Sequence, residues 1–136
     1  MRFTFVHTAD WQIGERFGGF DERLAGRLEE ARLNAIDTLA HVAAEHGAKH
    51  VLVAGDVYDA PDLNEKAVRQ PLTRMAQHRD LTWVLLPGNH DLAGVGSIWS
   101  RVRKYGVADN IILADRPEPI DIATGVTVLP APLTAK

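Results

Sequence analysis

Residues Val51–Asp59 read Val-Leu-Val-Ala-Gly-Asp-Val-Tyr-Asp, and this stretch decides the fold. A short run of Val and Leu closed by a glycine predicts a strand that is buried on both faces. A carboxylate, Asp56, follows at the carboxyl end of that strand. Open α/β sheets bind their ligands at the carboxyl ends of their strands. The stretch therefore predicts a central strand of an α/β sheet with a functional carboxylate at its tip.

The same order of strand and polar residue occurs twice more. Residues 3–9 predict a strand that runs into Asp10. Residues 81–86 predict a strand that runs into the sequence Pro-Gly-Asn-His-Asp, in which the amide is Asn89. Because loops after parallel strands converge on one edge of a sheet, we expect Asp10, Asp56 and Asn89 to lie close together.

The segments between these strands have helical patterns. We expect helices over residues 21–46, from about 62 to 78 and over 97–104, with further strands at 110–113 and 126–129. Asp62 and Glu65 have the spacing of a capping box for the second helix, and Pro71 should kink or restart that helix. The alternation of strands and helices predicts an α/β fold with a mainly parallel sheet built from βαβ units.

The helix expected over residues 21–46 has an apolar face and a charged face. The apolar positions recur at helical spacing and should face the core: Leu24, Leu28, Ala31, Ala35, Leu39, Val42 and Ala43. The charged positions are typical of a solvated face: Arg23, Arg27, Glu29, Glu30 and Arg32.

The composition is that of one globular domain over residues 1–136, with 46% hydrophobic and 24% charged residues and no candidate membrane span. The formal net charge of −3 does not decide whether the substrate is a nucleic acid. Because there is no cysteine, a metal ion must be held by carboxylate, imidazole, amide or backbone oxygen. The N-terminus is too quickly polar for a signal peptide, so we expect a cytoplasmic protein.

The polar residues at the strand tips are suited to divalent metal ions. Asp10, Asp56 and Asn89 offer hard oxygen donors, and a shared carboxylate can bridge two cations about 3.5–4 Å apart, the spacing that clamps a phosphoryl displacement. Asp56, on the central strand, is the natural bridge. Gln12 is either a direct ligand through its oxygen, a residue that holds a ligand or a water, or a residue without a metal role.

Other residues beside these tips are candidates for catalysis or substrate binding. His90 and Asp91 are the candidate catalytic residues: His90 could serve as an acid or hydrogen-bond donor to a phosphate, and Asp91 or Asp59 could orient its neighbours. Trp11 could stack on a nucleobase, although burial under its own loop is the simpler interpretation. His7, in the middle of a strand, is interpreted as a core histidine rather than a ligand.

Three motifs resemble those of a known family. Residues 55–59 (GDVYD) and 88–91 (GNHD) resemble, in the same order, the GDxxD and GNHD motifs of the calcineurin-like metallophosphoesterases. Residues 7–14 (HTADWQIG) resemble the H-T-A/S-D-x-H-L-G opening of the SbcD-like branch of DNA-repair exonucleases. The resemblance covers essentially the whole chain and implies the N-terminal half of an α/β/β/α sandwich.

The resemblance also implies a role for each matching residue. Asp10 would bind a first metal ion, Asp56 would bridge the two ions and Asn89 would bind the second. His90 would contact the scissile phosphate and protonate the leaving oxygen. The ions in such enzymes are usually Mn²⁺, with iron, zinc or magnesium in relatives; DNA is the implied substrate, and an SbcC-like ATPase is the implied partner.

Two features depart from the family pattern. Gln12 stands where the motif has a histidine, which replaces an imidazole with an amide oxygen, a poorer donor. The family's later GH and GHxH motifs, which complete both metal shells, do not occur before Lys136. Half of a two-sheet sandwich would expose an apolar sheet face, so we expect a further C-terminal segment or a second copy of the chain to cover it.

These observations predict a nuclease-like phosphodiester hydrolase. A first alternative keeps the chemistry but takes a nucleotide or another small phosphodiester as substrate. A second alternative is a catalytically impaired binding or assembly module, which both departures favour. A generic nucleotide-binding domain is disfavoured because the chain has no Gly-rich phosphate loop of the GxxxxGKS/T or GxGxxG type.

Overall fold

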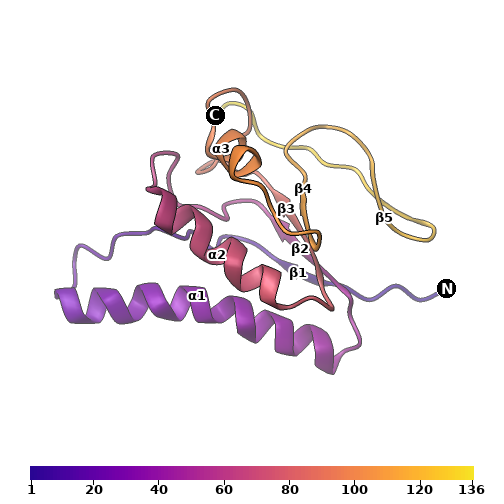
Figure 1. The fold of residues 1–136 in the computed structure, drawn as a ribbon, viewed down its shortest axis with the longest axis horizontal. Helices are drawn as coiled ribbons and strands as arrows, with labels where there is room; N and C mark the ends of the chain where they lie inside the picture. Colours follow the sequence, from indigo (N-terminus) through magenta and orange to yellow (C-terminus); the bar gives the residue numbers. More distant parts are fainter.

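A four-stranded parallel sheet is the centre of the computed structural model, which describes all 136 residues (Figure 1). In chain order the elements are β1 (Val6–Thr8), α1 (Glu22–Glu45), β2 (His50–Ala54), α2 (Glu65–Gln77), β3 (Thr82–Leu86), α3 (Ile98–Tyr105), β4 (Ile111–Leu113), β5 (Ile120–Ala123) and β6 (Val126–Val128). Strands β1 to β4 lie side by side in sequence order and are all parallel, which confirms the α/β fold of βαβ units.

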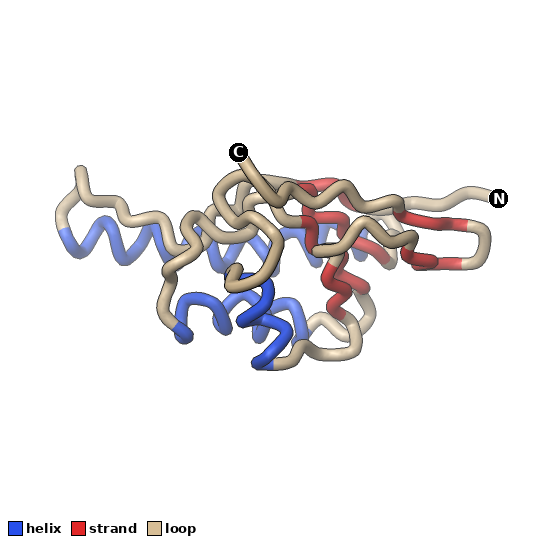
Figure 2. The backbone as a smooth tube through the Cα atoms, turned by 90° about the horizontal axis from the view of Figure 1, so that it is seen from above, coloured by secondary structure: helices blue, strands red, loops and turns tan.

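The three helices cover one face of this sheet. Right-handed crossovers that always advance in the same direction place every helix on the same side, and Figure 2 shows this arrangement. Val51 and Val53 of β2 lie beside Trp83 and Leu85 of β3, and all four are buried. They pack with side chains of all three helices into one hydrophobic core of 20 residues. No helix combines the length and the apolar surface that a membrane crossing requires.

The opposite face of the sheet is only partly covered. Leu52 and Leu86 on this face are half-buried, and Phe5, just before β1, is 46% exposed. His7 alternates with the core-packed Val6 and is exposed. The interpretation of His7 as a core histidine was therefore wrong. Successive side chains of a strand point to opposite faces of the sheet, so His7 points away from the helices. Coverage of this face by a further segment or a second copy stays a prediction.

The face that α1 presents to the core differs from the expected one. Its buried residues are Leu33, Ile36, Ala40 and Ala43, whereas Leu24 and two other expected core positions of its first turns are not buried. The observed stripe is displaced from the predicted one by one residue, or about 100° around the helix. Of the predicted positions only Ala43 is fully buried, although the partly buried Leu39 also packs against the core. The predicted helix was therefore right, and its predicted inner face was displaced.

Two local predictions for α2, a capping box that begins at Asp62 and a restart of the helix at Pro71, were also wrong, whereas a kink at Pro71 stays a prediction. The helix is capped by Asn64, whose Oδ1 accepts the Ala67 N–H at 2.9 Å, rather than by Asp62. Pro71 lies inside the helix without ending it, and its ring is buried. Since proline removes only one helical hydrogen bond, burial of the ring can offset part of that loss.

The strand β5 was not predicted. It pairs with β6 in an antiparallel hairpin, which is separate from the main sheet. The buried His50 at the start of β2 contacts this hairpin, because its Nε2 donates to the Ile122 carbonyl at 2.9 Å. The hairpin is therefore attached at the amino end of the strands, away from the polar strand tips.

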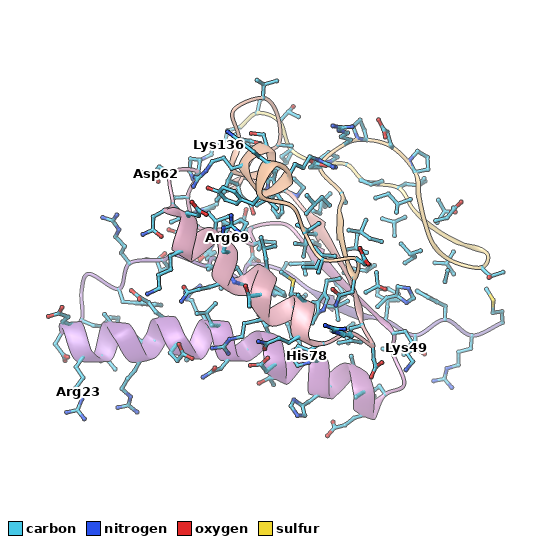
Figure 3. All side chains as sticks on the ribbon, viewed as in Figure 1. Arg23, Lys49, Asp62, Arg69, His78 and Lys136 are labelled. Carbon is cyan, nitrogen blue, oxygen red and sulfur yellow. The ribbon has the colours of Figure 1, made fainter.

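Charged side chains join α1 and α2 on the outer surface. Arg74 of α2 donates to Glu30 at 2.7 Å, to Asn34 at 2.7 Å and to Asp37 at 2.9 Å. His78, labelled in Figure 3, lies 2.7 Å from Asp37. The His78 contact is the largest cause that lowers the pKa of Asp37 below its usual value. Glu30 therefore belongs to an interhelical network and not to a purely solvated face.

We expect Asp37→Asn to remove the stability that this network contributes. Because the folded-state pKa of Asp37 is lowered, the contribution is present above the unfolded value of 3.8 and is lost as the pH falls through the folded-state value. The loss at neutral pH should be below about 1 kcal/mol, since Asp37 is 36% exposed. Urea unfolding of both proteins measures it. A wild-type advantage that persists undiminished well below that pH would contradict the assignment.

Candidate metal centre

The loops after β1 and β2 are joined at the carboxyl edge of the sheet. The Asp10 N–H donates to the Gly55 carbonyl at 3.1 Å, and the Gln12 N–H donates to the Asp56 carbonyl at 2.9 Å. One residue further along, an isolated parallel bridge continues this pairing. The first and second predicted ligand loops therefore lie side by side, as the strand order led us to expect.

Three of the four candidate metal ligands have a left-handed backbone. The angle φ is 58° at Asp10, 46° at Gln12 and 54° at Asp56, and no other non-glycine residue has a positive φ. This conformation costs an L-residue about 1–2 kcal/mol. It persists where surrounding contacts enforce it, and it clusters at functional sites. Only these three non-glycine residues have the left-handed conformation, so backbone geometry and sequence motifs point to the same edge of the sheet.

The carboxylate of Asp91 connects the loop after β3 to the loop after β2. Its Oδ1 accepts the N–H groups of Gly88 at 2.7 Å and Asp56 at 3.2 Å, and its Oδ2 accepts the Tyr58 N–H at 3.1 Å. The Asp91 carbonyl accepts the indole N–H of Trp99 at 2.7 Å. Asp91 is fully buried. Its side chain thus holds the two loops together, and the orienting and catalytic roles expected for it stay predictions.

Burial dominates the electrostatics of these groups. It raises the pKa of Asp91 to about 6, and the nearby Asp56 carboxylate adds to this effect. The hydrogen bonds from Gly88 and Tyr58 oppose the rise by stabilising the ionised form. The phenol of Tyr58 is buried beside Asp91. Burial is the main cause that raises the pKa of Tyr58, and the negative charge of Asp91 adds to the rise.

The loop after β3 also contacts Asp56 directly. Asp56 is only 5% exposed, and its Oδ1 accepts the His90 N–H at 2.9 Å. The backbone of Gly88 packs so closely that a Cβ there would lie 2.6 Å from the Asp56 nitrogen and would overlap Oδ1. The loops that bear Asp10, Asp56 and Asn89 are therefore contiguous.

The imidazole of His90 has one fixed and one free nitrogen. Nδ1 lies 2.8 Å from the carbonyl of Asp59 and 3.5 Å from the carboxylate of the same residue. Because a carbonyl can only accept, Nδ1 must carry the proton of this bond. Nε2 is then left for other partners, on a side chain that is 39% exposed. The Asp59 carbonyl therefore sets the tautomer of His90, and the role predicted for Asp59 in the site stays a prediction.

The donor types at this edge suit hard divalent cations. Asp10 and Asn89 are exposed, while Asp56 is buried. Carboxylate and amide oxygens are ligands for Mn²⁺ and Mg²⁺, so the residue types fit such ions. However, no three His, Cys, Asp or Glu side chains lie close enough together to hold a metal ion, so the set depends on the amides of Asn89 and Gln12. Their ligation stays a prediction.

Trp11 packs under its own loop. Its side chain is half-buried, and its indole N–H donates to Thr8 Oγ1 at 3.0 Å. Its ring meets Trp83 edge-on, with the centroids 6.0 Å apart. This packing agrees with the burial interpretation, and stacking on a nucleobase stays a prediction.

A pocket of about 570 Å³ opens beside the centre, between α1, the loop after β1 and the segment that leads into α2. Asp59, which contacts His90, is part of its wall. Arg16 and Arg32 line it together with acidic residues such as Glu29. There is thus space for a ligand next to the candidate centre, in a wall of mixed charge.

Arg32 is a residue of this site that the sequence interpretation placed on the solvated face of α1. Its Nη1 donates to the carbonyl oxygens of Trp11 at 2.8 Å and Gln12 at 3.4 Å. The signal that could have found it is spacing, because Arg32 lies four residues before the buried Ile36 and so on the same stripe of the helix. A charged side chain on an inward stripe requires a partner.

The motifs and this geometry agree with a comparison of the sequence with known families. Residues 3–127 match the calcineurin-like phosphoesterase family. The chain belongs to this family. Its members are phosphoesterases and typically bind two metal ions. The four-stranded parallel sheet agrees with the N-terminal half of the family's fold.

The curated proteins to which the chain is similar are components of a nuclease. The chain is 28% identical over 89 residues to the SbcD component of the SbcCD nuclease from Bacillus subtilis (strain 168), and 30% identical over 89 residues to that from Escherichia coli (strain K12). These alignments cover 63% of the chain but only 21% and 20% of the relatives. The chain spans about a fifth of their length, and the similarity is distant.

We expect Gly88→Ala to displace the Asp56 loop, because a Cβ at this position overlaps the Asp56 carboxylate. The free energy of unfolding should fall by about 1–3 kcal/mol. The control is Gly26→Ala in α1, where a Cβ meets nothing within 4 Å and the free energy of unfolding should rise by up to about 1 kcal/mol. Urea unfolding of the two variants compares them, and a Gly88→Ala protein as stable as the wild type would disprove the close packing.

We expect Asp91→Ala to loosen both loops, because three buried N–H groups lose their acceptor. Each unsatisfied donor costs about 1–3 kcal/mol, so the free energy of unfolding should fall by at least about 3 kcal/mol. Asp109→Asn, at an exposed carboxylate, is the control and should change it by less than about 0.5 kcal/mol. Similar small effects of the two substitutions would show that Asp91 does not hold the loops.

Proposed function

We propose that the protein is a metal-dependent phosphodiester hydrolase, a nuclease of the DNA-repair type. The observation that supports this proposal is the junction of three strand-tip loops, which places Asp10, Asp56 and Asn89 at one edge of the sheet with His90 beside them. Membership of the phosphoesterase family supports the reaction class, and the distant similarity to the SbcD component of the SbcCD nuclease supports DNA as the substrate.

The residues at this edge would divide the binding of two ions. Asp10, with or without Gln12, would hold the first ion, Asn89 would hold the second, and Asp56 would lie between them. Two divalent ions, Mn²⁺ by preference and iron, zinc or magnesium as alternatives, would supply a nucleophilic water at neutral pH and neutralise charge on the phosphate. The left-handed backbone at Asp10 and Asp56 would hold both carboxylates in position before any ion binds.

His90 would act on the leaving group. Because Nδ1 is committed to the Asp59 carbonyl, a second proton must reside on Nε2, and from there it can pass to the leaving oxygen. The backbone N–H of His90 meanwhile holds Oδ1 of Asp56. His90 thus holds the Asp56 carboxylate, which would lie between the ions, with its backbone, and it would protonate the leaving group with its side chain.

Three substitutions test the reaction class. With Mn²⁺ added, Asp56→Asn and His90→Asn should each lower kcat by at least about 100-fold on a phosphodiester, while the exposed Asp109→Asn control retains wild-type activity. Asp56→Asn should also weaken Mn²⁺ binding, whereas His90→Asn should not. If all three variants hydrolyse the substrate at the wild-type rate, hydrolysis does not occur at this site.

Substrate class is tested separately, with linear duplex DNA and bis(p-nitrophenyl) phosphate compared under the same conditions. A nuclease should degrade the DNA, whereas an enzyme for small phosphodiesters should cleave only the chromogenic compound. An SbcC-like ATPase as partner belongs to the same proposal, since SbcD is by name one component of the SbcCD nuclease.

A binding or assembly module is the second candidate. The observation that favours it is the donor set, which contains only two carboxylates and no group of three His, Cys, Asp or Glu side chains. A module of this kind would bind DNA or a protein partner equally well as wild type and as Asp56→Asn, and would hydrolyse neither substrate with saturating Mn²⁺.

A further inference from the structure

The loop from Asp10 to Gln12 requires external support. Both end residues have a left-handed backbone, with φ of 58° and 46°. Their N–H groups are bound to the loop after β2, which fixes one side of the loop. The carbonyl groups of Trp11 and Gln12 accept hydrogen bonds from Arg32 of α1, and the Gln12 carbonyl also accepts the Glu15 N–H at 3.1 Å. The loop is therefore clamped from two sides, by backbone on one and by a guanidinium on the other.

The environment of Arg32 suits a fixed clamp. Its guanidinium lies over the ring of Phe17, 5.0 Å from the centroid, so an aromatic face restricts its movement. No carboxylate lies within ion-pair distance of it, unlike Arg74 on the neighbouring helix. Its own helix is anchored by the buried Leu33 and Ile36. A cation without an acidic partner thus directs its hydrogen bonds to main-chain oxygen.

We propose that Arg32 is a positioning residue for the first metal ion. By holding the carbonyl groups of Trp11 and Gln12, it maintains the left-handed conformation that presents Asp10 and Gln12 at the sheet edge. This inference rests on the proposed metal centre and adds a residue from α1 to it. Partners that orient ligands in this way typically alter metal affinity by 10–100-fold when they are removed.

The competing interpretation is that Arg32 binds substrate. It lines the 570 Å³ pocket beside the centre, where a guanidinium could contact a phosphate. The two interpretations differ in what is lost on substitution. A positioning residue affects Mn²⁺ affinity and the metal-free loop, whereas a phosphate-binding residue affects KM and leaves Mn²⁺ affinity unchanged.

The experiment measures Mn²⁺ binding by electron paramagnetic resonance in the full chain. Arg32→Gln should weaken binding by at least about tenfold, and Arg32→Lys, which keeps the charge and a donor, should recover part of that loss. The matched control is Arg23→Gln on the same helix, since Arg23 is exposed and projects away from the protein in Figure 3. Its Mn²⁺ affinity should equal that of the wild type.

Amide hydrogen exchange of the metal-free protein independently measures how firmly the loop from Asp10 to Gln12 is held. In Arg32→Gln the N–H groups of Gln12 and Ile13 should exchange at least about tenfold faster, while those of the central strand β3 stay as in the wild type. If Arg32→Gln is too unstable to study, Arg32→Lys is measured in its place and should show the same local change to a smaller degree.

The outcomes separate this inference from the proposed function. Asp10→Ala and Asp56→Asn serve as reference variants, and wild-type Mn²⁺ affinity in both would refute the metal centre itself. If they lose Mn²⁺ while the Arg32 variants keep wild-type affinity and wild-type exchange at Gln12, the positioning role is refuted. An increase of KM alone would assign Arg32 to the substrate.

Discussion

A buried carboxylate holds together the loops at the carboxyl edge of the sheet. Asp91 accepts three backbone N–H groups, from Gly88, Asp56 and Tyr58, and so joins the loops after the two central strands. Parallel strands bring loops to a common edge but do not fix their conformations. The Asp91 side chain supplies that second constraint from a fully buried position, where a hydrogen bond to an ionised group is strong and an unpaired one is costly.

The strain at this edge follows from the same arrangement. Asp10, Gln12 and Asp56 have a left-handed backbone, and the N–H group of each donates a hydrogen bond to a neighbouring segment. A metal site gains from such rigidity, because ligands that are already positioned lose little freedom when an ion binds. The scaffold that enforces it is the hydrophobic core under the helices, from which α1 extends Arg32 to the first loop. The conformation of the candidate metal ligands therefore depends on the strained loops, and the loops depend on the packed core.

The sequence predicted those features that depend on local pattern. Apolar runs that end in polar residues gave the parallel strands and placed Asp56 and Asn89 at their tips, and motif order gave the family. It did not predict features that depend on orientation in three dimensions. The helical period alone predicted an inner stripe of α1 that is displaced by one residue, and Arg32 was therefore assigned to the solvated face. The sequence also did not distinguish the exposed face of β1 from the buried one, and His7 was therefore assigned to the core. The acceptor role of Asp91 depends on loops that only the fold brings together.

The central claim is that side chains from separate strand tips share one cation site. The most direct test is a crystal structure with Mn²⁺, using anomalous scattering at the manganese edge to locate the ions. We expect anomalous peaks within bonding distance of the Asp10 and Asp56 carboxylates and of the Asn89 amide oxygen, with Asp56 between two ions when both sites are filled. Crystals saturated with Mn²⁺ that show no peak at this edge, or that show peaks only elsewhere on the protein, would contradict it.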